Sequence, residues 1–491
     1  MRRHGLPGLP TVLVWIGAMA VLAAGCSGSP GKRTADGSVP PSSSPLPSPT
    51  GRDTGEVNRD DVNGDGRADL VVNGWYKQPK IGGRWFNNRF VAFASPSGLD
   101  PAAAFRLSDR LVRPDPRIDS SPIFRDTSVQ FTGDLDDDGH ADIVVRTTRS
   151  DGTGAVTHDQ LIVWGGPEGA VGSTELPSGT LGAAAVGDFD GDGALDLLTL
   201  GPPSPDHELS PQPATVLHGP LGRDGGTPRT TTTLDVGRGG WVPVAHALTG
   251  DFDGDGYDDL VTKAGYGEED ARLEEPDMPE VDHASLYRGT PEGLEEAGSV
   301  PGITDDSPWY GAVPVAAGDF DGDGYDDILG RTEDEEVVVV PGSARGPGRG
   351  RAPVRLEGVR FGNPLTPVTG DVNGDGHDDV AVQTRGRERR VGEVTVLLGG
   401  PGGLSADRAV RIDRHAIGLG GRPRHSGDRD FFGWDLHLAD LDADGRDELV
   451  VGTFGFNKPR KDAGYWILSG TDSGPSTTDR RFVATKDFGG G

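Results

Sequence analysis

The sequence predicts an all-β fold, a seven-bladed β-propeller, and three observations lead to this prediction. An acidic nonapeptide recurs seven times, with starts 52 to 73 residues apart. A turn rich in Gly and Pro follows each copy, and no helical period of apolar residues is sustained beyond the N-terminal segment. Units of this length suit blades of four short strands, and a closed ring of blades leaves only short, protected sheet edges.

The acidic nonapeptide is expected to link the first strand of each blade to the second. Each copy has an apolar residue at its second position and is followed by a short β-rich run. The copies are DVNGDGRAD at 61, DLDDDGHAD at 134, DFDGDGALD at 188, DFDGDGYDD at 251 and 319, DVNGDGHDD at 371 and DLDADGRDE at 440.

The second repeated feature is an apolar strand that runs into a Gly/Pro turn, which predicts the third strand of each blade and its turn into the fourth. It occurs at residues 93–99, 163–169, 216–222, 286–294, 338–346, 397–404 and 467–474. Because the two features alternate in a fixed order, each pair defines one blade.

The loop composition is typical of a calcium site. Positions 1, 3 and 5 offer side-chain oxygens, Gly at position 6 permits a sharp turn, position 7 offers its carbonyl and position 9 an acid. Up to seven Ca²⁺ ions are therefore predicted. The candidate ligands are Asp61, Asn63, Asp65, Arg67 and Asp69; Asp134, Asp136, Asp138, His140 and Asp142; Asp188, Asp190, Asp192, Ala194 and Asp196; Asp251, Asp253, Asp255, Tyr257 and Asp259; Asp319, Asp321, Asp323, Tyr325 and Asp327; Asp371, Asn373, Asp375, His377 and Asp379; and Asp440, Asp442, Asp444, Arg446 and Glu448.

Other interpretations of the loop fit less well. An EF-hand needs a bidentate Glu at position 12, where this chain has Val, Thr or Gly. A solvated turn explains one copy as well as calcium does, but it leaves seven clusters of mutually repelling carboxylates. Glycoside hydrolysis needs one opposed acid pair. Mg²⁺ tends to keep its waters, so the all-protein ligand set favours Ca²⁺.

The units resemble the FG-GAP (VCBS-type) repeats of bacterial surface proteins and of the integrin α-subunit head. The resemblance covers roughly residues 56–491 and is carried mainly by the acidic loops. The FG dipeptide appears as Tyr310-Gly311, Phe361-Gly362 and Phe432-Gly433, and residues 450–454 come nearest to the GAP end. The resemblance to FG-GAP repeats implies that a partner binds on the face opposite the calcium loops.

On that face, the hairpins of the first and last blades combine aromatic and basic residues. Residues 73–90 and 452–466 contain aromatic side chains among Lys and Arg residues in an otherwise acidic chain. A protein or glycan ligand is the expected partner, although some of the aromatic side chains could simply pack the hairpins. The candidate ligand-binding residues are Trp75, Tyr76, Trp85, Phe86, Phe454, Phe456 and Tyr465.

The N-terminal segment is interpreted as a processing signal. Residues 1–25 predict a lipoprotein signal peptide, because a basic start and an apolar stretch lead into LAAGC, which ends at Cys26. The alternative is an ordinary secretory signal. Residues 26–55 predict a disordered tether and residues 56–491 the propeller. The protein is thus expected outside the cytoplasm, held to the membrane only by lipidated Cys26.

Composition and motifs narrow the function. A net charge of −30 and a pI near 4.6 argue against nucleic acid, whose phosphates attract basic residues. The chain has no HExxH, GxSxG or P-loop motif, so we expect a non-catalytic binding module. The alternatives are a polysaccharide lyase or hydrolase of the cell envelope, and an inert spacer. An enzyme should show converging His, Arg and acidic side chains outside the calcium loops, and we expect none.

Overall fold

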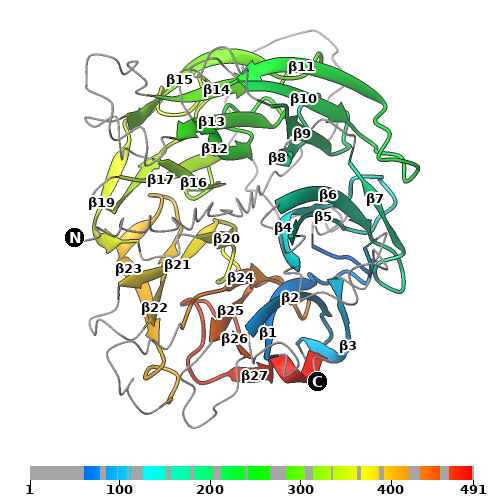
Figure 1. Ribbon diagram of the computed structural model, residues 1–491. Helices are drawn as coiled ribbons and strands as arrows, with labels where there is room; N and C mark the ends of the chain where they lie inside the picture. The colour runs from blue at the N-terminus through cyan, green and yellow to red at the C-terminus, as the bar shows by residue number, and fades with distance from the viewer. Residues whose placement is uncertain are drawn as a thin grey trace, which may run out of the picture.

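The structure is a computed structural model that describes residues 60–77, 85–96, 98–107, 110–111, 125–150, 156–176, 182–202, 212–237, 242–265, 283–304, 313–332, 335–361, 367–385, 392–419, 432–453 and 464–488. Seven antiparallel sheets follow one another around a ring (Figure 1). The predicted seven-bladed β-propeller is confirmed.

Six sheets have four strands and the first has three among the described residues. In chain order the sheets are β1 (Leu70–Lys77), β2 (Trp85–Phe93) and β3 (Asp100–Arg106); β4 (Arg125–Gly133), β5 (Asp142–Ser150), β6 (Val156–Trp164) and β7 (Gly172–Glu175); β8 (Gly182–Gly187), β9 (Asp196–Leu200), β10 (Gln212–His218) and β11 (Thr230–Val236); β12 (Val242–Gly250), β13 (Asp259–Gly265), β14 (His283–Arg288) and β15 (Glu295–Thr304); β16 (Val313–Gly318), β17 (Asp327–Arg331), β18 (Glu336–Val340) and β19 (Val354–Arg360); β20 (Val368–Gly370), β21 (Asp379–Arg385), β22 (Gly392–Leu398) and β23 (Ser405–Asp413); and β24 (Leu436–Ala439), β25 (Glu448–Thr453), β26 (Gly464–Leu468) and β27 (Arg480–Ala484).

The order of strands places the repeated motifs. In every four-stranded blade the acidic loop joins the first and second strands, and the Gly/Pro turn joins the third and fourth. Neighbouring strands are antiparallel, so both connections lie at the same end of the blade. The hairpins between second and third strands lie at the other end. The ring therefore has an acidic-loop face and a hairpin face.

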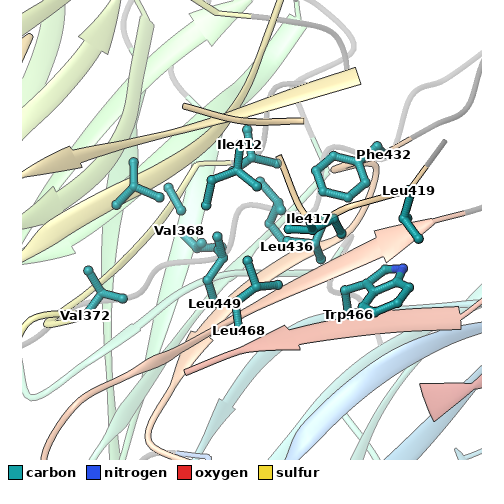
Figure 2. Packing of buried hydrophobic residues seen from close by; sticks show 14 of the residues in the cluster. Val368, Val372, Ile412, Ile417, Leu419, Phe432, Leu436, Leu449, Trp466 and Leu468 are labelled. Atoms are coloured by element: carbon teal, nitrogen blue, oxygen red, sulfur yellow. The ribbon is translucent and has the colours of Figure 1, made fainter. Parts of the chain in front are cut away.

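The apolar core lies between neighbouring blades. The second residue of each acidic loop, such as Phe252 or Phe320, is buried and packs between the strands of its own blade and those of the following blade. Figure 2 shows one such cluster, where Ile412 and Phe432 meet Leu449 and Trp466 between the sixth and seventh sheets. Burial of one large apolar side chain is worth about 1.5–3 kcal/mol, which explains why an apolar residue stands at that position in all loops.

The ring closes through the C-terminal segment. Strand β27 completes the last blade by pairing with β26, and the 3₁₀ helix η4 (Thr485–Phe488) packs against β1 and β3 of the first blade (Figure 1). Phe488 is 1% exposed, and its ring stacks on Phe90 with centroids 6.2 Å apart. The C-terminal segment therefore contacts both the last and the first blade. The sequence alone leaves open which of the two it joins.

Residues 1–59, which include the predicted signal peptide, Cys26 and the tether, lie outside the described residues. Among the residues that the structure describes, no helix is both long and apolar enough to span a membrane.

Candidate metal centres

The first carboxylate of each loop shapes the loop backbone. In the fourth loop, Asp251 accepts hydrogen bonds from the amides of Gly254, Asp255 and Gly256 at 2.7, 3.1 and 3.0 Å. The N–H of Tyr257 donates to Asp255 Oδ1 at 3.1 Å. These bonds curl nine residues into a compact turn, which brings alternate side chains to one side.

Position 4 of the loop needs a left-handed backbone, a requirement that the sequence interpretation missed. Gly254 has φ +72°, and a Cβ there would lie 2.6 Å from the ring of Tyr325 in the next loop. Only Asp137 and Ala443 take this conformation without glycine in the described loops, at φ 59° and 62°. A side chain in this region costs roughly 1–2 kcal/mol, so the second and seventh loops are strained.

The predicted ligands converge. One oxygen each from Asp251, Asp253 and Asp255 lies within 4.8 Å of the others, and the same holds for the corresponding residues of the third and fifth loops. In the second loop the convergent set is Asp134, Asp136 and Asp142. The structure therefore brings the predicted side chains together as clusters that could hold a metal ion.

Orphaned oxygens show that these clusters fit a cation. Oδ1 of the position-3 carboxylates Asp136, Asp190 and Asp253 is buried without a hydrogen-bond partner, and so is Oδ2 of Asp259. A buried, unpaired carboxylate oxygen is costly unless a cation or a proton meets it. The set of hard oxygens suits Ca²⁺, with position 7 able to add its carbonyl as predicted.

The position-9 acid joins the two repeated motifs. Asp379 accepts the N–H of Val372 on Oδ2 at 3.1 Å and that of Gly399 in the Gly/Pro turn on Oδ1 at 2.7 Å. Asp142 makes the same pair of bonds with Leu135 and Gly165. The acid therefore fixes the turn between the third and fourth strands to the loop between the first and second.

Burial dominates the electrostatics of position 9. It raises the pKa of Asp69 and Asp379 to about 7, with neighbouring loop carboxylates adding to the effect. The same causes raise the pKa of Asp142, Asp196, Asp259, Asp327 and Glu448 to about 8. Seven acids that resist ionisation by themselves are suited to give up a proton only when a cation arrives.

Arginines approach four of the clusters, which sequence spacing did not reveal. Arg288 Nε lies 3.0 Å from Asp253, and an Arg351 nitrogen lies 2.7 Å from Asp323. Arg229 contacts Asp190 and Asp192, and Arg223 reaches Asp136 and Asp138 from the neighbouring blade. These guanidinium groups neutralise part of the loop charge in the second to fifth loops. Hydrogen bonding to Asp321 correspondingly raises the pKa of Arg351.

Hydrogen bonds between neighbouring loops recur around the ring. The N–H at position 8 donates to the carbonyl at position 1 of the preceding loop, as from Asp326 to Asp251 at 3.0 Å and from Ala141 to Asp61 at 2.7 Å. The bond from Ala68 to Asp440, at 3.2 Å, closes the ring. It recurs at six blade junctions within the described residues.

Four position-8 residues are acids: Asp258, Asp326, Asp378 and Asp447. The carboxylate of Asp326 accepts the N–H of Asp251 at 3.0 Å, which makes the link reciprocal. The space for it comes from Gly250, where a Cβ would lie 2.6 Å from that carboxylate. Gly187, Gly318 and Gly370 stand in the same relation to the other three acids. We call each such Gly–Asp pair an acid clasp.

The predicted ligand-binding residues are only partly described. Trp75 and Tyr76 lie in β1 opposite Asn87 and Phe86 of β2, with Trp85 opposite Lys77, so the strands bring these positions together. Phe454 and Phe456 lie outside the described residues. Tyr465 does not fit a surface patch: it is fully buried, and its hydroxyl donates to Asp435 at 2.7 Å.

Outside the acidic loops, a His, an Arg and an acid approach one another at the junction of the last and first blades, whereas the sequence predicts no such group. Asp435 and His437 stand two residues apart at the hairpin end of β24, with their side chains 3.6 Å apart. Burial alone would raise the pKa of Asp435, but His437, Arg89 and the Tyr465 hydroxyl outweigh it and hold this pKa below its usual range. Trp434 beside them is 38% exposed.

The buried position of Tyr465 depends on a glycine in the neighbouring strand. Gly452 of β25 pairs with Tyr465, and a Cβ at Gly452 would lie 3.3 Å from the tyrosine ring and 2.8 Å from Asp435. Because Gly452 has no side chain, the ring of Tyr465 can lie against the strand and reach the carboxylate.

Family comparisons agree with the repeat pattern. Residues 319–382 match the model described as FG-GAP-like repeat, and residues 244–271 match the FG-GAP repeat. The protein is an FG-GAP repeat propeller. Among solved structures, a mutant of AofleA from Arthrobotrys oligospora with three arginines replaced by alanine is similar over 70% of this chain and 83% of its own, at 10% identity and a TM-score of 0.35. A likeness at that level does not bear on function.

Proposed function

We propose that this FG-GAP repeat propeller is a calcium-stabilised, non-catalytic binding module that is held outside the cytoplasm by a lipid anchor. The calcium part rests on the acidic loops, where buried carboxylate oxygens such as Asp253 Oδ1 have no partner. The binding part rests on exposed Trp434 beside a charged cluster on the hairpin face.

Calcium at the loops would hold each blade together. One ion would contact the loop after the first strand and the position-9 acid, which already grips the Gly/Pro turn through bonds such as Asp379 to Gly399. An ion that binds only the folded state stabilises it by mass action. Because every loop has an acid at position 9, each blade offers an ion this ligand.

Chelation tests the calcium proposal. We expect the melting temperature of the purified protein to fall by many degrees in excess chelator and to recover with Ca²⁺ but not with an equal concentration of Mg²⁺. Ca²⁺ and Mg²⁺ should differ because the loops offer an all-protein oxygen cage that Mg²⁺ seldom uses. An unchanged melt in chelator would remove calcium from the proposal.

The ligand surface is proposed at the junction of the first and last blades. Trp434 lies next to Asp435 and His437, and Arg89 of β2 reaches them from the first blade. An exposed indole beside fixed polar groups is a common arrangement for stacking on a sugar ring or for anchoring a protein side chain. The strand positions of Trp75 and Trp85 extend the same face.

A binding screen with paired variants tests this surface. Glycan arrays and pull-downs from envelope extracts should yield a ligand whose binding Trp434→Ala weakens roughly tenfold or more, as expected for an anchoring aromatic. Val171→Ala is the control, because Val171 is 54% exposed but follows a turn on the acidic-loop face. Equal binding by both variants would move the ligand surface elsewhere.

A second candidate function, an envelope polysaccharide lyase or hydrolase, is favoured by the same cluster. His437, Asp435 and Arg89 are the kinds of side chain that such an enzyme uses. However, Tyr465 is fully buried and its hydroxyl donates a hydrogen bond to Asp435. The lowered pKa of Asp435 also makes this aspartate a poor general acid. Release of new chain ends from a bound polysaccharide, lost in His437→Ala, would favour the enzyme.

The lipid anchor is proposed from Cys26, which is the single cysteine of the chain. Metabolic labelling with a radioactive fatty acid should mark the protein in cells. Cys26→Ala should remove the label and release the protein from the membrane fraction. Label retained in the variant would place the anchor elsewhere.

A further inference from the structure

A histidine from the third strand of its own blade lies against the third loop. His218 ends β10 just before the Gly/Pro turn and is 1% exposed. Its Nδ1 lies 3.0 Å from Asp196 Oδ2 and 3.2 Å from Asp190 Oδ2. The corresponding residues of the second and sixth blades are Trp164 and Leu398, which carry no metal ligand. The three side chains form a group that could hold a metal ion.

The separations suit the ligands of a small divalent ion. Ligands bound at about 2.0–2.2 Å and lying next to each other in the coordination shell are roughly 3–3.5 Å apart. Both distances from His218 Nδ1 fall in that range. The other oxygen of Asp190, Oδ1, is buried without a hydrogen-bond partner, and the Asp190 side chain is 10% exposed. A further cation contact is therefore open at this residue.

The imidazole is also supported from behind. His218 Nε2 lies 2.9 Å from Thr232 Oγ1 on β11. Metal-binding histidines usually donate their second ring N–H to an oxygen in this way, which fixes the tautomer that leaves the first nitrogen free to bind. Gly293 of the next blade leaves room for this pair, since a Cβ there would lie 3.2 Å from Thr232 Oγ1.

A nitrogen ligand distinguishes this loop from the others. Arg229 contacts Asp192 and lies 2.6 Å from Asp190 Oδ2, as other arginines do in the second, fourth and fifth loops, so the arginine alone does not set this loop apart. Ca²⁺ takes six to eight oxygen ligands, whereas zinc is satisfied by three or four ligands and accepts imidazole. The chemistry of this loop has therefore shifted from hard oxygens toward a nitrogen ligand.

We propose that the third loop binds a zinc-type divalent transition-metal ion through His218 Nδ1, Asp190 and Asp196, in place of the calcium ion proposed for the other loops. The proposal rests on the proposed metal-binding role of the loops. Arg229 stays on Asp192 and neutralises the carboxylate that the smaller ion does not need. Thr232 orients the ring without touching the metal.

The test loads the full-length protein with zinc while calcium is in large excess. We expect about one tightly held zinc per chain by elemental analysis, and imidazole scattering in its zinc-edge X-ray absorption spectrum. His218→Asn should abolish the imidazole signal and weaken zinc binding by tenfold or more. Thr232→Val, which keeps the ligands, should weaken it roughly tenfold, so the test survives if the first variant misfolds.

His377→Asn is the matched control, because His377 Nδ1 lies 3.0 Å from the single carboxylate Asp375 in the sixth loop. It should leave zinc binding unchanged. Loss of zinc on exposure to calcium, a spectrum without imidazole, or unchanged affinity in both His218→Asn and Thr232→Val would each overturn the proposal and leave the contacts of His218 as structural hydrogen bonds. Calcium-dependent melting is read separately on zinc-free protein, so failure of the calcium proposal is distinguished from failure of this one.

Discussion

The blade junctions of the ring are of two kinds. The four junctions from the third blade to the seventh have acid clasps, with Asp at position 8 of one loop facing Gly before the loop of the preceding blade. The other three have Ala68, Ala141 or Leu195 at position 8. We call these the plain junctions. They include the one where the last blade meets the first.

The plain junctions are held by different contacts. Between the first two blades, the Thr132 hydroxyl donates to Asp60. At the closing junction, Phe488 and Phe90 share one apolar cluster with Tyr465 of the last blade. Buried polar clasps fix geometry because an unpaired partner is costly, whereas apolar contacts tolerate repacking. The middle of the chain is therefore specified by polar pairs and the closure by apolar packing.

The largest expected effect is the pH dependence of stability that the position-9 acids cause in blades at both kinds of junction. In calcium-free protein the position-9 acids have folded pKa values of about 7 to 8, well above the ordinary values of 3.8 for Asp and 4.5 for Glu. The folded state then binds protons more tightly, so this contribution to stability is full below about pH 4 and is lost as pH rises through 7 to 8.

Melting curves between about pH 4 and pH 9 check this sign. In chelator the melting temperature should fall as pH rises, apart from any general acid unfolding at the lowest pH. In saturating Ca²⁺ the acids stay ionised as ligands, so the melting temperature should instead fall as pH is lowered through the same window. Parallel curves with and without Ca²⁺ would contradict the ligand role of position 9.

Gly250→Ala should be more damaging than removal of the acid from the same clasp. The new Cβ would lie 2.6 Å from Asp326 Oδ2 and 3.1 Å from Phe252, and forced overpacking costs typically about 1–3 kcal/mol. Denaturant unfolding measures the loss. Gly172→Ala is the matched control, because nothing lies within 4 Å of a Cβ there. Comparable losses in both would show that the clasp geometry is irrelevant.

Asp326→Ala should cost less than that overpacking, toward the lower end of about 1–3 kcal/mol, because the partly buried N–H of Asp251 loses its acceptor. Asp326→Asn keeps a hydrogen-bond acceptor and removes the ionisable carboxyl group. Burial, together with the charges of Asp378 and Asp258, raises the pKa of that group. The Asn variant should therefore match or exceed the stability of the parent above neutral pH in denaturant unfolding. If Asn destabilised as much as Ala, the charge itself would be required for the clasp.

The smallest effect should distinguish the two kinds of junction directly. Hydrogen exchange in chelator should release the amides of Ala68 and Ala141 before those of Asp258 and Asp326, although all four bond a neighbouring loop. A second hydrogen bond is worth about 0.5–1.5 kcal/mol, which predicts roughly twofold to tenfold slower exchange. Uniform exchange around the ring would mean that the clasps add no local stability.

The sequence is a good guide to features that repeat in every blade. Positions 1, 3, 5 and 9 carry nearly the same side chains in all seven loops, so their convergence in loops such as Asp251–Asp259 can be predicted from one chain. The acidic loops and Gly/Pro turns also place the strands correctly. Periodic hydrogen bonding requires a periodic sequence, and this is why the fold is recoverable.

Features that join different blades are missed. The acid clasp pairs Gly250 with Asp326, which are distant in sequence, and it appears in only part of the ring. Arg223 reaches the second loop from the third blade. The sequence places Tyr465 at the surface because a basic segment, residues 458–461, precedes it in the same hairpin, but Gly452 leaves room for its ring in the core. Pairwise contacts of this kind leave no trace in the spacing of either partner.

The position of Phe488 has a consequence for how the protein is made. Its side chain packs on Phe90 of the first blade, so the first blade gains this contact only after the last blade has been synthesised. Such a long-range contact forms late, after the whole ring has been translated and, on the proposed route, exported. A polypeptide truncated before residue 485 would lack this contact, so the packing of the first blade depends on synthesis of all seven blades and of η4.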